Sequence, residues 1–169
     1  MSAINYVVGD ATRPAGSGMK IIAHCCNDIG AWGAGFVLAI SRRWRRPQQC
    51  FSESGGITPL GGVQFVEVEP DIIVANIIGQ HGCGFDEKGM PPIRYDAVAK
   101  GLEAVAHLAK SMGCSVHMPR IGCGLAGGEW PIVEKIIIDA LCAVDVPVFV
   151  YDLPVKSVRA QMACVGGAA

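Results

Sequence analysis

The chain has 169 residues, of which 51% are hydrophobic and 17% charged, a composition typical of one globular domain with a well-filled core. Its formal net charge of −1 argues against a nucleic-acid or membrane surface as the main partner. The eight cysteines include no C-x-x-C pair, so we expect free thiols, no metal site and a reducing compartment. We see no signal-peptide pattern and no apolar run of membrane length, and expect a cytoplasmic monomer.

Strands and helices alternate along the expected order of elements. In chain order we expect a strand at 3–8, a strand at 20–24, a helix at 36–44, a loop at 48–62, strands at 63–68 and 71–78, a loop at 80–94, a helix at 95–112, a strand at 115–119, a helix from Pro131 and a strand at 146–153. This order predicts a three-layer α/β/α fold with a mixed, mostly parallel sheet. We assign residues 1–154 to one domain and 155–169 to a C-terminal tail.

The patterns within these segments support the assignments. The segment 63–68 alternates apolar and polar residues, as an antiparallel strand with one solvated face does. The segment 71–78 is almost entirely apolar, which is typical of a central strand. The loop at 80–94 is long and rich in glycine and proline, and long irregular loops in small domains are usually functional.

Two glycine-rich segments each lead into an expected helix. G-A-W-G-A-G at 30–35 precedes the helix at Phe36, and G-C-G-L-A-G-G at 122–128 precedes Pro131. A glycine-rich turn at a helix N-terminus presents unpaired backbone N–H groups and the positive end of the helix dipole, and so binds phosphate. Either segment alone would suit an ordinary tight turn. Two of them can converge at the carboxyl ends of their strands, which predicts a diphosphate ligand. A dinucleotide G-x-G-x-x-G pattern after the first strand and a Walker A lysine motif are both missing.

The two ends of the domain carry candidates for binding a base. Asp10 follows the first strand and could accept hydrogen bonds from an exocyclic amine, or could bond its own backbone in a turn. Tyr151 and Leu153 lie on one face of the last strand and could flank a base, or could be ordinary core. The basic run R-R-W-R-R at 42–46 ends a helix, where it suits a solvated face or a phosphate-tracking patch for a modified nucleic acid.

Four segments together resemble the macro domain family: G-D-A-T at 9–12, H-C-C-N-D-I-G-A-W-G-A-G at 24–35, M-P-R-I-G-C-G-L at 118–125 and V-Y-D-L at 150–153. The resemblance is closest to the branch of the terminal ADP-ribosyl-glutamate hydrolase and the yeast ADP-ribose-1″-phosphate phosphatase. It implies a domain that binds ADP-ribose, or ADP-ribosylated protein or nucleic acid, without a cofactor.

The resemblance also implies binding roles for individual residues. Asp10 and Ala11 would hold the adenine, with Tyr151 and Leu153 beside it. Asn27 would face the distal ribose. The two glycine-rich loops would wrap the diphosphate and distal ribose with Gly30, Trp32, Gly33, Ala34, Gly35, Phe36, Ile121, Gly122, Cys123, Gly124 and Leu125.

The sequence departs from this branch at two positions. The family's ADP-ribosyl-glutamate hydrolase uses a lysine that attacks the distal ribose and an aspartate that assists, and Gln80 and Ala126 stand at these positions here. The glycine-rich loop pattern of the family's other hydrolase branch is missing as well. We therefore expect water, rather than a lysine, to attack the anomeric carbon.

Several polar side chains are candidates for assisting such a water. Gln80 and Asn27 would orient it, and Asp28 or the diphosphate would accept its proton. His24 and His81 are further acid–base candidates, although His24 also suits a structural role at a strand end and His81 a solvated loop.

The sequence therefore predicts a hydrolase that removes mono-ADP-ribose from acidic protein side chains or from a DNA base. Two alternatives stay open. The loss of the lysine and the aspartate favours a non-catalytic reader of ADP-ribose. A reactive residue near the distal ribose, such as His24, would favour an ADP-ribose-1″-phosphate phosphatase.

Overall fold

The computed structural model describes residues 2–54 and 58–155, and a six-stranded sheet forms its centre. The strand order is β1-β6-β5-β2-β4-β3. All neighbouring pairs are parallel except β3 and β4, which run antiparallel. The strands are β1 (Ile4–Val8), β2 (Lys20–Asn27), β3 (Val63–Glu69), β4 (Ile72–Gln80), β5 (Ser115–Pro119) and β6 (Val148–Asp152). The predicted mixed, mostly parallel sheet is confirmed.

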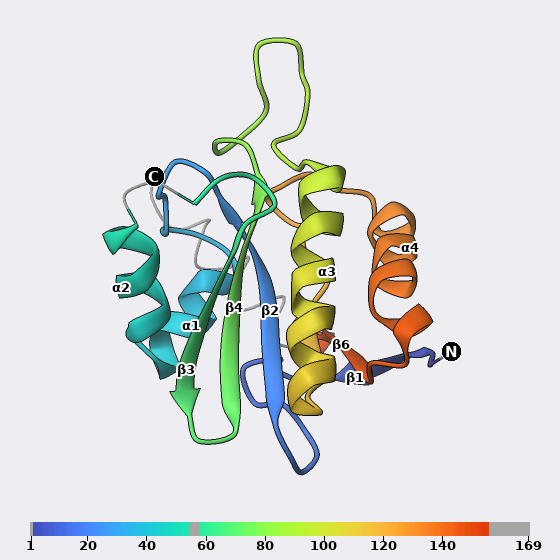
Figure 1. The fold of residues 1–169 in the computed structure, drawn as a ribbon. Helices are drawn as coiled ribbons and strands as arrows, with labels where there is room; N and C mark the ends of the chain where they lie inside the picture. The colour runs from blue at the N-terminus through green and yellow to red at the C-terminus, as the bar shows by residue number, and fades with distance from the viewer. Residues whose placement is uncertain (1, 55–57, 156–169) are drawn as a thin grey trace.

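Helices cover both faces of this sheet, as Figure 1 shows. They are α1 (Phe36–Arg43), α2 (Arg46–Glu53), α3 (Tyr95–Met112) and α4 (Trp130–Ala140), with a short 3-10 turn, η1 (Cys142–Val144). The first two helices lie on one face and α3 and α4 on the other, which confirms the three layers. No helix in the described ranges combines the length and the apolar character needed to cross a membrane.

The two central strands, β2 and β4, are buried along almost their whole length. Successive side chains of a strand point to opposite faces, so each strand supplies both layers of core. Ile21 and Ile77 pack in the cluster beneath α3 and α4, whereas Ile22 and Val74 pack with Ile40 of α1. This double coverage explains why the sequence of β4 is apolar rather than alternating.

Most of the expected bounds differ from the structure by one or two residues, and two expectations differ by more. Strand β2 continues three residues beyond the expected 20–24 and ends at Asn27. The expected loop at 48–62 was wrong in its first part, because α2 occupies Arg46–Glu53. Pro47 lies in the first turn of α2, where proline is favoured, and the buried Phe51 anchors the helix to the sheet. The expected tail at 155–169 lies, apart from Val155, outside the described residues.

Two histidines are part of the core. His24 is 1% exposed and its Nε2 donates to Asn76 Oδ1 at 2.6 Å. His117 is 0% exposed, is hydrogen-bonded to the Tyr151 hydroxyl at 2.9 Å, and stacks on Phe149 with ring centroids 4.7 Å apart. Burial lowers the pKa of each histidine to about 4, so both rings are neutral in the folded protein at neutral pH.

The buried histidines predict a loss of stability on mild acidification. In the unfolded chain a histidine titrates near pH 6.5, so between about pH 6.5 and 4 the unfolded state binds more protons than the folded state. The free energy of unfolding should be fully retained above this range and fall within it, by up to ~1.4 kcal/mol per pH unit for each histidine. Urea denaturation between pH 7.5 and 4.5 measures this slope. His24→Gln should make it shallower and the exposed His107→Gln should not; equal slopes in all three proteins would contradict the prediction.

A second prediction concerns the contact between α3 and β4. A methyl group on Gly101 would lie 2.3 Å from Ile77 Cγ2, on a branched side chain held in the core. Overpacking costs about 1–3 kcal/mol, more than the roughly 1 kcal/mol that alanine gains over glycine in a helix. Gly101→Ala should therefore lower the free energy of unfolding in urea, whereas Glu103→Ala, on the exposed face of α3, should leave it within about 0.5 kcal/mol. An unchanged Gly101→Ala protein would mean that Ile77 moves aside at little cost.

Candidate functional site

The two glycine-rich loops meet at one edge of the sheet. The first follows β2 and the second follows β5, and these two strands pair in parallel. A methyl group on Gly35, the N-cap of α1, would lie 3.7 Å from Leu125 Cδ1 of the second loop. No side chain caps the first turn of α1, in which the Leu38 N–H donates to the Gly35 carbonyl at 3.2 Å. The expected convergence of the two loops is therefore present in the structure.

Glycine serves two different purposes in these loops. Methyl groups on Gly122 and Gly128 would lie 2.6 Å from Ile93 Cδ1, so packing within the protein requires glycine at both. By contrast, added methyl groups on Gly33 and Gly124 would meet no described atom within 4 Å, and neither residue has the positive φ that favours glycine. Neither packing nor backbone conformation explains these two, which is the arrangement expected where a ligand approaches the backbone closely.

The other residues of the first loop are of two kinds: small exposed residues, and larger side chains that fix the loop to the protein. Gly30, Ala34 and Gly35 are exposed. Trp32 and Phe36 turn their rings inward onto His24, with centroid distances of 5.5 and 5.8 Å. Trp32 Nε1 also donates to Ser41 Oγ at 2.8 Å, which fixes the loop on α1. These two half-buried side chains hold the loop in shape.

The second loop is anchored in the same manner. Ile121 is buried and Cys123 half-buried, whereas Leu125 is 67% exposed at the junction. The preceding Arg120 donates from Nε and Nη2 to the two carboxylate oxygens of Asp152, at 2.7 and 2.8 Å, and its guanidinium lies 4.7 Å from the ring of Trp130. This clamp joins the ends of β5 and β6 to the start of α4. Arg120 lies within the M-P-R-I-G-C-G-L segment, for which the resemblance implied no role of this residue.

Four polar residues gather where β2 and β4 end. Asn27 and Gln80 are register partners there, beside an irregularity between Cys26 and Asn27. Asp28 and His81 follow them directly, and the Asp28 N–H donates to the Gln80 carbonyl at 3.1 Å. The structure thus brings together four of the five candidate catalytic residues, from segments more than fifty positions apart.

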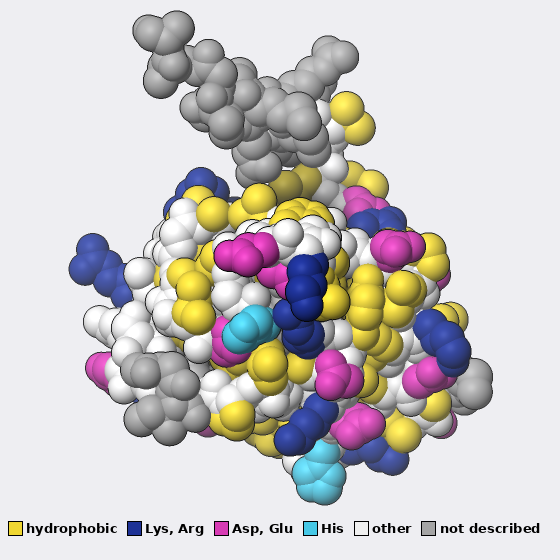
Figure 2. Space-filling model, turned by 90° about the horizontal axis from the view of Figure 1, so that it is seen from above, with side chains coloured by type: hydrophobic (Ala, Val, Ile, Leu, Met, Phe, Trp, Pro, Cys, Tyr) yellow, Lys and Arg dark blue, Asp and Glu magenta, His cyan; other side chains and the backbone are white. Residues whose placement is uncertain are grey.

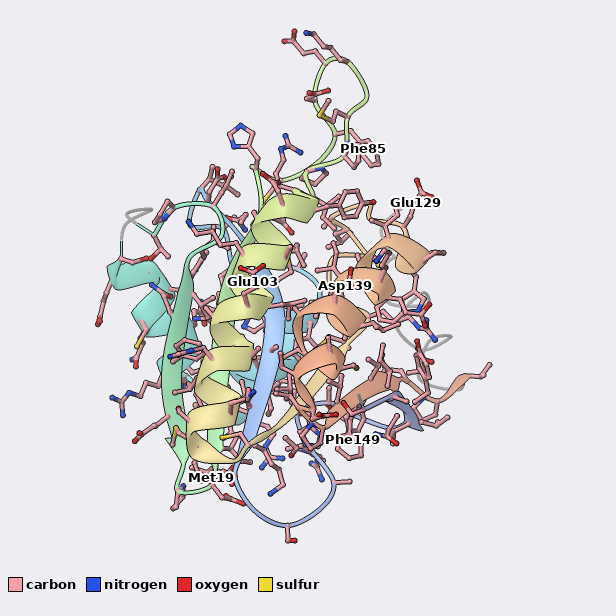
Figure 3. The ribbon with its side chains drawn as sticks, turned by 45° about the vertical axis from the view of Figure 1, so that its right-hand side comes forward. Met19, Phe85, Glu103, Glu129, Asp139 and Phe149 are labelled. Atoms are coloured by element: carbon pink, nitrogen blue, oxygen red, sulfur yellow. The ribbon has the colours of Figure 1, made fainter. Side chains whose placement is uncertain are left out.

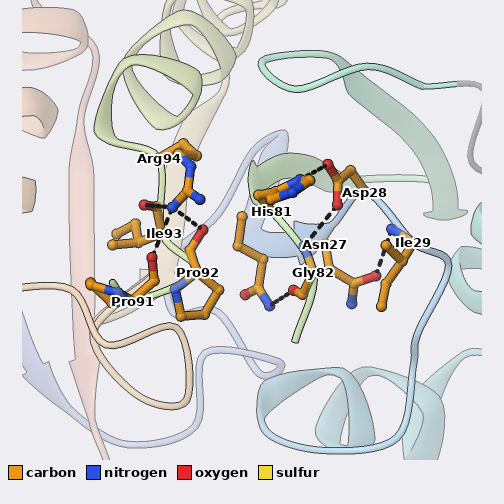
Figure 4. Close-up of polar contacts among 10 residues, drawn as sticks. Asn27, Asp28, Ile29, His81, Gly82, Pro91, Pro92, Ile93 and Arg94 are labelled. Atoms are coloured by element: carbon orange, nitrogen blue, oxygen red, sulfur yellow. Dashed lines mark hydrogen bonds and ion pairs between the residues drawn. The ribbon is translucent and has the colours of Figure 1, made fainter. Parts of the chain in front are cut away.

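Asn27 folds its own loop. Its Oδ1 accepts hydrogen bonds from the N–H groups of Ile29 and Ala31, at 3.2 and 2.9 Å, and its Nδ2 donates to the Ala31 carbonyl at 2.6 Å (Figure 4 draws the contact with Ile29). The side chain is buried with a residue exposure of 6%. These contacts differ from the prediction that Asn27 faces a ribose or a water, because both of its polar atoms are used by the turn at 28–31.

Asp28 and His81 form a hydrogen-bonded pair across the two strand ends, shown in Figure 4. His81 Nδ1 lies 2.7 Å from Asp28 Oδ2, and the Gly82 N–H donates to Oδ1 at 2.8 Å. Partial burial raises the pKa of Asp28, but the hydrogen bonds from Gly82 and His81 lower it more, so the net pKa lies below its ordinary value. A carboxylate stabilised in this way is a poor proton acceptor, which weakens the expectation that Asp28 takes a proton itself.

His24, the fifth candidate, is not at this site. Its ring lies in the core between Trp32, Phe36 and Asn76, with a pKa lowered to about 4 by burial. The prediction that His24 acts as an acid or base is therefore wrong, and the structural role that the sequence left open applies. The apolar residues around position 24 belong to two faces of a central strand, which the sequence pattern alone could not divide.

The loop between β4 and α3 rises beside the second glycine-rich loop (Figure 1). Gln80 Nε2 donates to the Gly82 carbonyl at 3.1 Å at the start of this loop, and Ile93 N–H donates to the Ala126 carbonyl at 3.1 Å at its end. A methyl group on Gly127 would lie 3.1 Å from Phe85, a side chain that is itself 65% exposed near the base of the loop (Figure 3). The loop is thus tied to the end of β4 and to the second glycine-rich loop.

The candidates for binding a base are divided between turn, core and surface. Asp10 Oδ1 accepts hydrogen bonds from the N–H and hydroxyl of Thr12, at 2.9 and 2.8 Å, which is the turn arrangement. Ala11 is buried. Tyr151 is 5% exposed and its hydroxyl accepts from the Ala15 N–H at 3.0 Å, so its ring belongs to the core, whereas Leu153 is 44% exposed. The expectation that Tyr151 flanks a base is not supported by this burial.

The charges around the site are mixed. Seen from above, the face at the strand ends shows acidic and basic side chains interspersed with apolar ones (Figure 2). Within the basic run at 42–46, Arg43 donates hydrogen bonds from Nη2 to Glu69 Oε1 at 3.0 Å and from Nη1 to the Thr12 carbonyl at 2.9 Å. In the described part of the chain, no group of three or more His, Cys, Asp or Glu side chains could hold a metal ion.

A groove on the other side of the molecule lies between α3 and α4. It is lined by alanines together with Glu103, His107 and Lys110 of α3 and Asp139 of α4. Glu103 and Asp139 lie part-way along their helices, below the level of Phe85 and Glu129 (Figure 3). The groove is therefore separate from the strand ends that carry the polar cluster.

Solved structures share this fold and much of the sequence. A protein of unknown function from Bacteroides thetaiotaomicron is 54% identical, with a TM-score of 0.87, over 89% of this chain and 98% of that chain. A macrodomain protein from Streptomyces coelicolor is 50% identical, with a TM-score of 0.78, over 88% of this chain and 98% of that chain.

Among curated proteins, mouse chromodomain-helicase-DNA-binding protein 1-like is 30% identical over 169 residues, which cover 94% of this chain but 19% of the mouse protein. Human ADP-ribose glycohydrolase OARD1 is 27% identical over 90% of this chain and 93% of its own length. No protein-family model matches the sequence. The similarity to the Streptomyces protein nevertheless spans nearly all of both chains at half identity, and with the shared fold it shows that this chain belongs to the macro domain family.

Proposed function

We propose that the protein is a hydrolase that binds ADP-ribosyl groups and removes mono-ADP-ribose from acidic protein side chains or from a DNA base. One observation carries the proposal: two open glycine-rich loops meet beside the polar cluster at the ends of β2 and β4. The loops suit a diphosphate, since they offer backbone N–H groups and open space at Gly33 and Gly124. The cluster then lies where a group beyond the diphosphate would be held.

The order of the site fits the parts of ADP-ribose. Asp10 and the Ala11 backbone, after β1, would meet the adenine end. The two loops would hold the diphosphate, and the distal ribose would extend toward Gln80 at the end of β4. The name of the human relative, an ADP-ribose glycohydrolase, supports cleavage at that ribose.

The residues present favour water as the nucleophile. A glutamine amide is not nucleophilic, so Gln80 cannot form the covalent adduct that a lysine would. Ala126 is 5% exposed and packs in the core, so the chain offers no carboxylate at that position. Gln80 Nε2 donates to the Gly82 carbonyl, which orients the amide and directs its carbonyl oxygen to accept a hydrogen bond from a water. Departure of the leaving group through an oxocarbenium-like state then needs positioning more than nucleophilic strength.

A non-catalytic reader is the second candidate. The combination of Gln80 and the buried Ala126 favours it, because both positions lack the reactive groups of the related hydrolase. The third possibility, a phosphatase, loses its main support with the burial of His24.

A direct test is release of free ADP-ribose. Purified protein should release it from at least one of glutamate-linked, arginine-linked and DNA-linked ADP-ribose, without accumulating a protein–ADP-ribose adduct. Gln80→Ala should reduce turnover ~10–1000-fold, as for removal of one positioning group, while ADP-ribose affinity by calorimetry stays nearly the same. Gln49→Ala, on the exposed side of α2, should change neither quantity.

Two results would refute this mechanism. Wild-type protein that binds ADP-ribose but releases none from any linkage would establish the reader. A covalent adduct trapped on wild-type protein would place the nucleophile on a protein side chain.

The proposed phosphate-binding role of the second glycine-rich loop is tested by placing a large side chain in it. Gly124→Glu puts a bulky negative group where the diphosphate would lie, so ADP-ribose binding should be abolished in calorimetry. Thermal stability should change little, because no described atom lies within 4 Å of an added methyl group there. Ala104→Glu, which adds the same charge on the exposed side of α3, should keep wild-type affinity. Unchanged affinity in Gly124→Glu would rule out this loop as the phosphate site.

A further inference from the structure

We infer that His81 is the general base of the proposed hydrolysis and that Asp28 is the positioning residue that fixes its tautomer. The inference rests on the proposed function. It assigns a paired role to two residues that the sequence offered only as separate candidates. The structure joins them across the ends of the two central strands, at 2.7 Å between His81 Nδ1 and Asp28 Oδ2.

The pair is oriented as a proton-transfer pair would be. The Gly82 N–H holds Asp28 Oδ1, so the carboxylate is fixed on both oxygens. Because this carboxylate stays ionised, it accepts the Nδ1 proton of His81 and leaves Nε2 as the basic ring nitrogen. The side chain of Asp28 is 18% exposed, whereas that of His81 is 63% exposed. The ring is therefore held from the protected side and open to solvent on the other.

The position of the pair also suits the reaction. His81 follows Gln80, whose amide is set to orient a water, and the His81 N–H is itself fixed by the Pro92 carbonyl at 2.8 Å. The opposite charge facing the imidazole comes from Asp28, at the end of β2. Arg94, on the return of the same loop, donates from Nη1 to the carbonyls at 91–93, to one side of the pair in Figure 4. Asp86, Glu87 and Lys88 carry the charges at the tip of that loop.

The proposed step balances as follows. The water oxygen forms a bond to the anomeric carbon of the distal ribose, and the bond from that carbon to the leaving group breaks, with its electron pair departing on the leaving group. The water proton passes to His81 Nε2. The imidazolium is stabilised by Asp28 and then returns the proton to the leaving group or to solvent, which restores the pair.

An alternative is that the pair has only a structural role and joins the segment after β2 to the segment after β4. Substitutions can separate the catalytic role from the structural one. His81→Ala should lower kcat/KM about 10²–10⁴-fold, flatten the acid side of its pH profile and leave ADP-ribose affinity nearly unchanged. Added imidazole should restore part of the activity, since the exposed side chain leaves an accessible space. His81→Asn can still donate a hydrogen bond to Asp28, so it should restore the tie between the loops but not the activity.

Two further variants complete the experiment. Asp28→Asn should lower kcat without abolishing ADP-ribose binding, because the ring loses its fixed tautomer. The exposed His107→Ala, in the groove between α3 and α4, should keep wild-type activity and pH profile. An active wild type with fully active His81→Ala or His81→Asn would overturn the role of the pair alone. A wild type that releases no ADP-ribose from any linkage would overturn the proposed function, and the role of the pair with it.

Discussion

The parallel pairing of β2 with β4 is the constraint on which the rest of the site depends. Parallel strands end at the same edge, so residues far apart in sequence are delivered to one place. The irregularity between Cys26 and Asn27 sets Gln80 opposite Asn27 at that edge. Asp28 and His81 then come within reach of each other because each follows one of these partners. A shift of one residue in either strand would separate the pair and turn its core side chains to the wrong face.

The edge of the sheet that carries the site has two parts, one made of backbone groups and the other of polar side chains. The proposed binding part consists of backbone: two loops held in place by inward-facing rings such as Trp32 and by the ion pair of Arg120 with Asp152. In the polar part, Asn27 and Gln80 are held by main-chain groups, whereas Asp28 and His81 also hold each other. This arrangement suits the proposed site, which would hold phosphates through backbone N–H groups rather than through charged side chains.

Much of this could be predicted from the sequence, and the failures have a common cause. Periodicity gave the bounds of α3 and β5 correctly, since both have strong local patterns. The glycine-rich loops were recognisable because helix N-termini have a local signature. Helix α2 was missed because its short polar sequence depends on one buried anchor, Phe51. The role of His24 and the partnership of Asp28 with His81 depend on which face a side chain takes and on strand register, neither of which a local pattern encodes.

In the proposed site, the two kinds of glycine separate the requirements of folding from those of ligand recognition, across the two glycine-rich loops. At Gly122 and Gly128 the protein's own atoms exclude a side chain, so variation there is limited by the folded state itself. At Gly33 and Gly124 a small side chain meets no described atom within 4 Å, so it should leave the stability of the folded state nearly unchanged. A mutational scan that reads protein abundance would score these two positions as tolerant, and a scan that reads ligand capture would score them as intolerant. The difference between the two maps would outline the ligand without a bound structure.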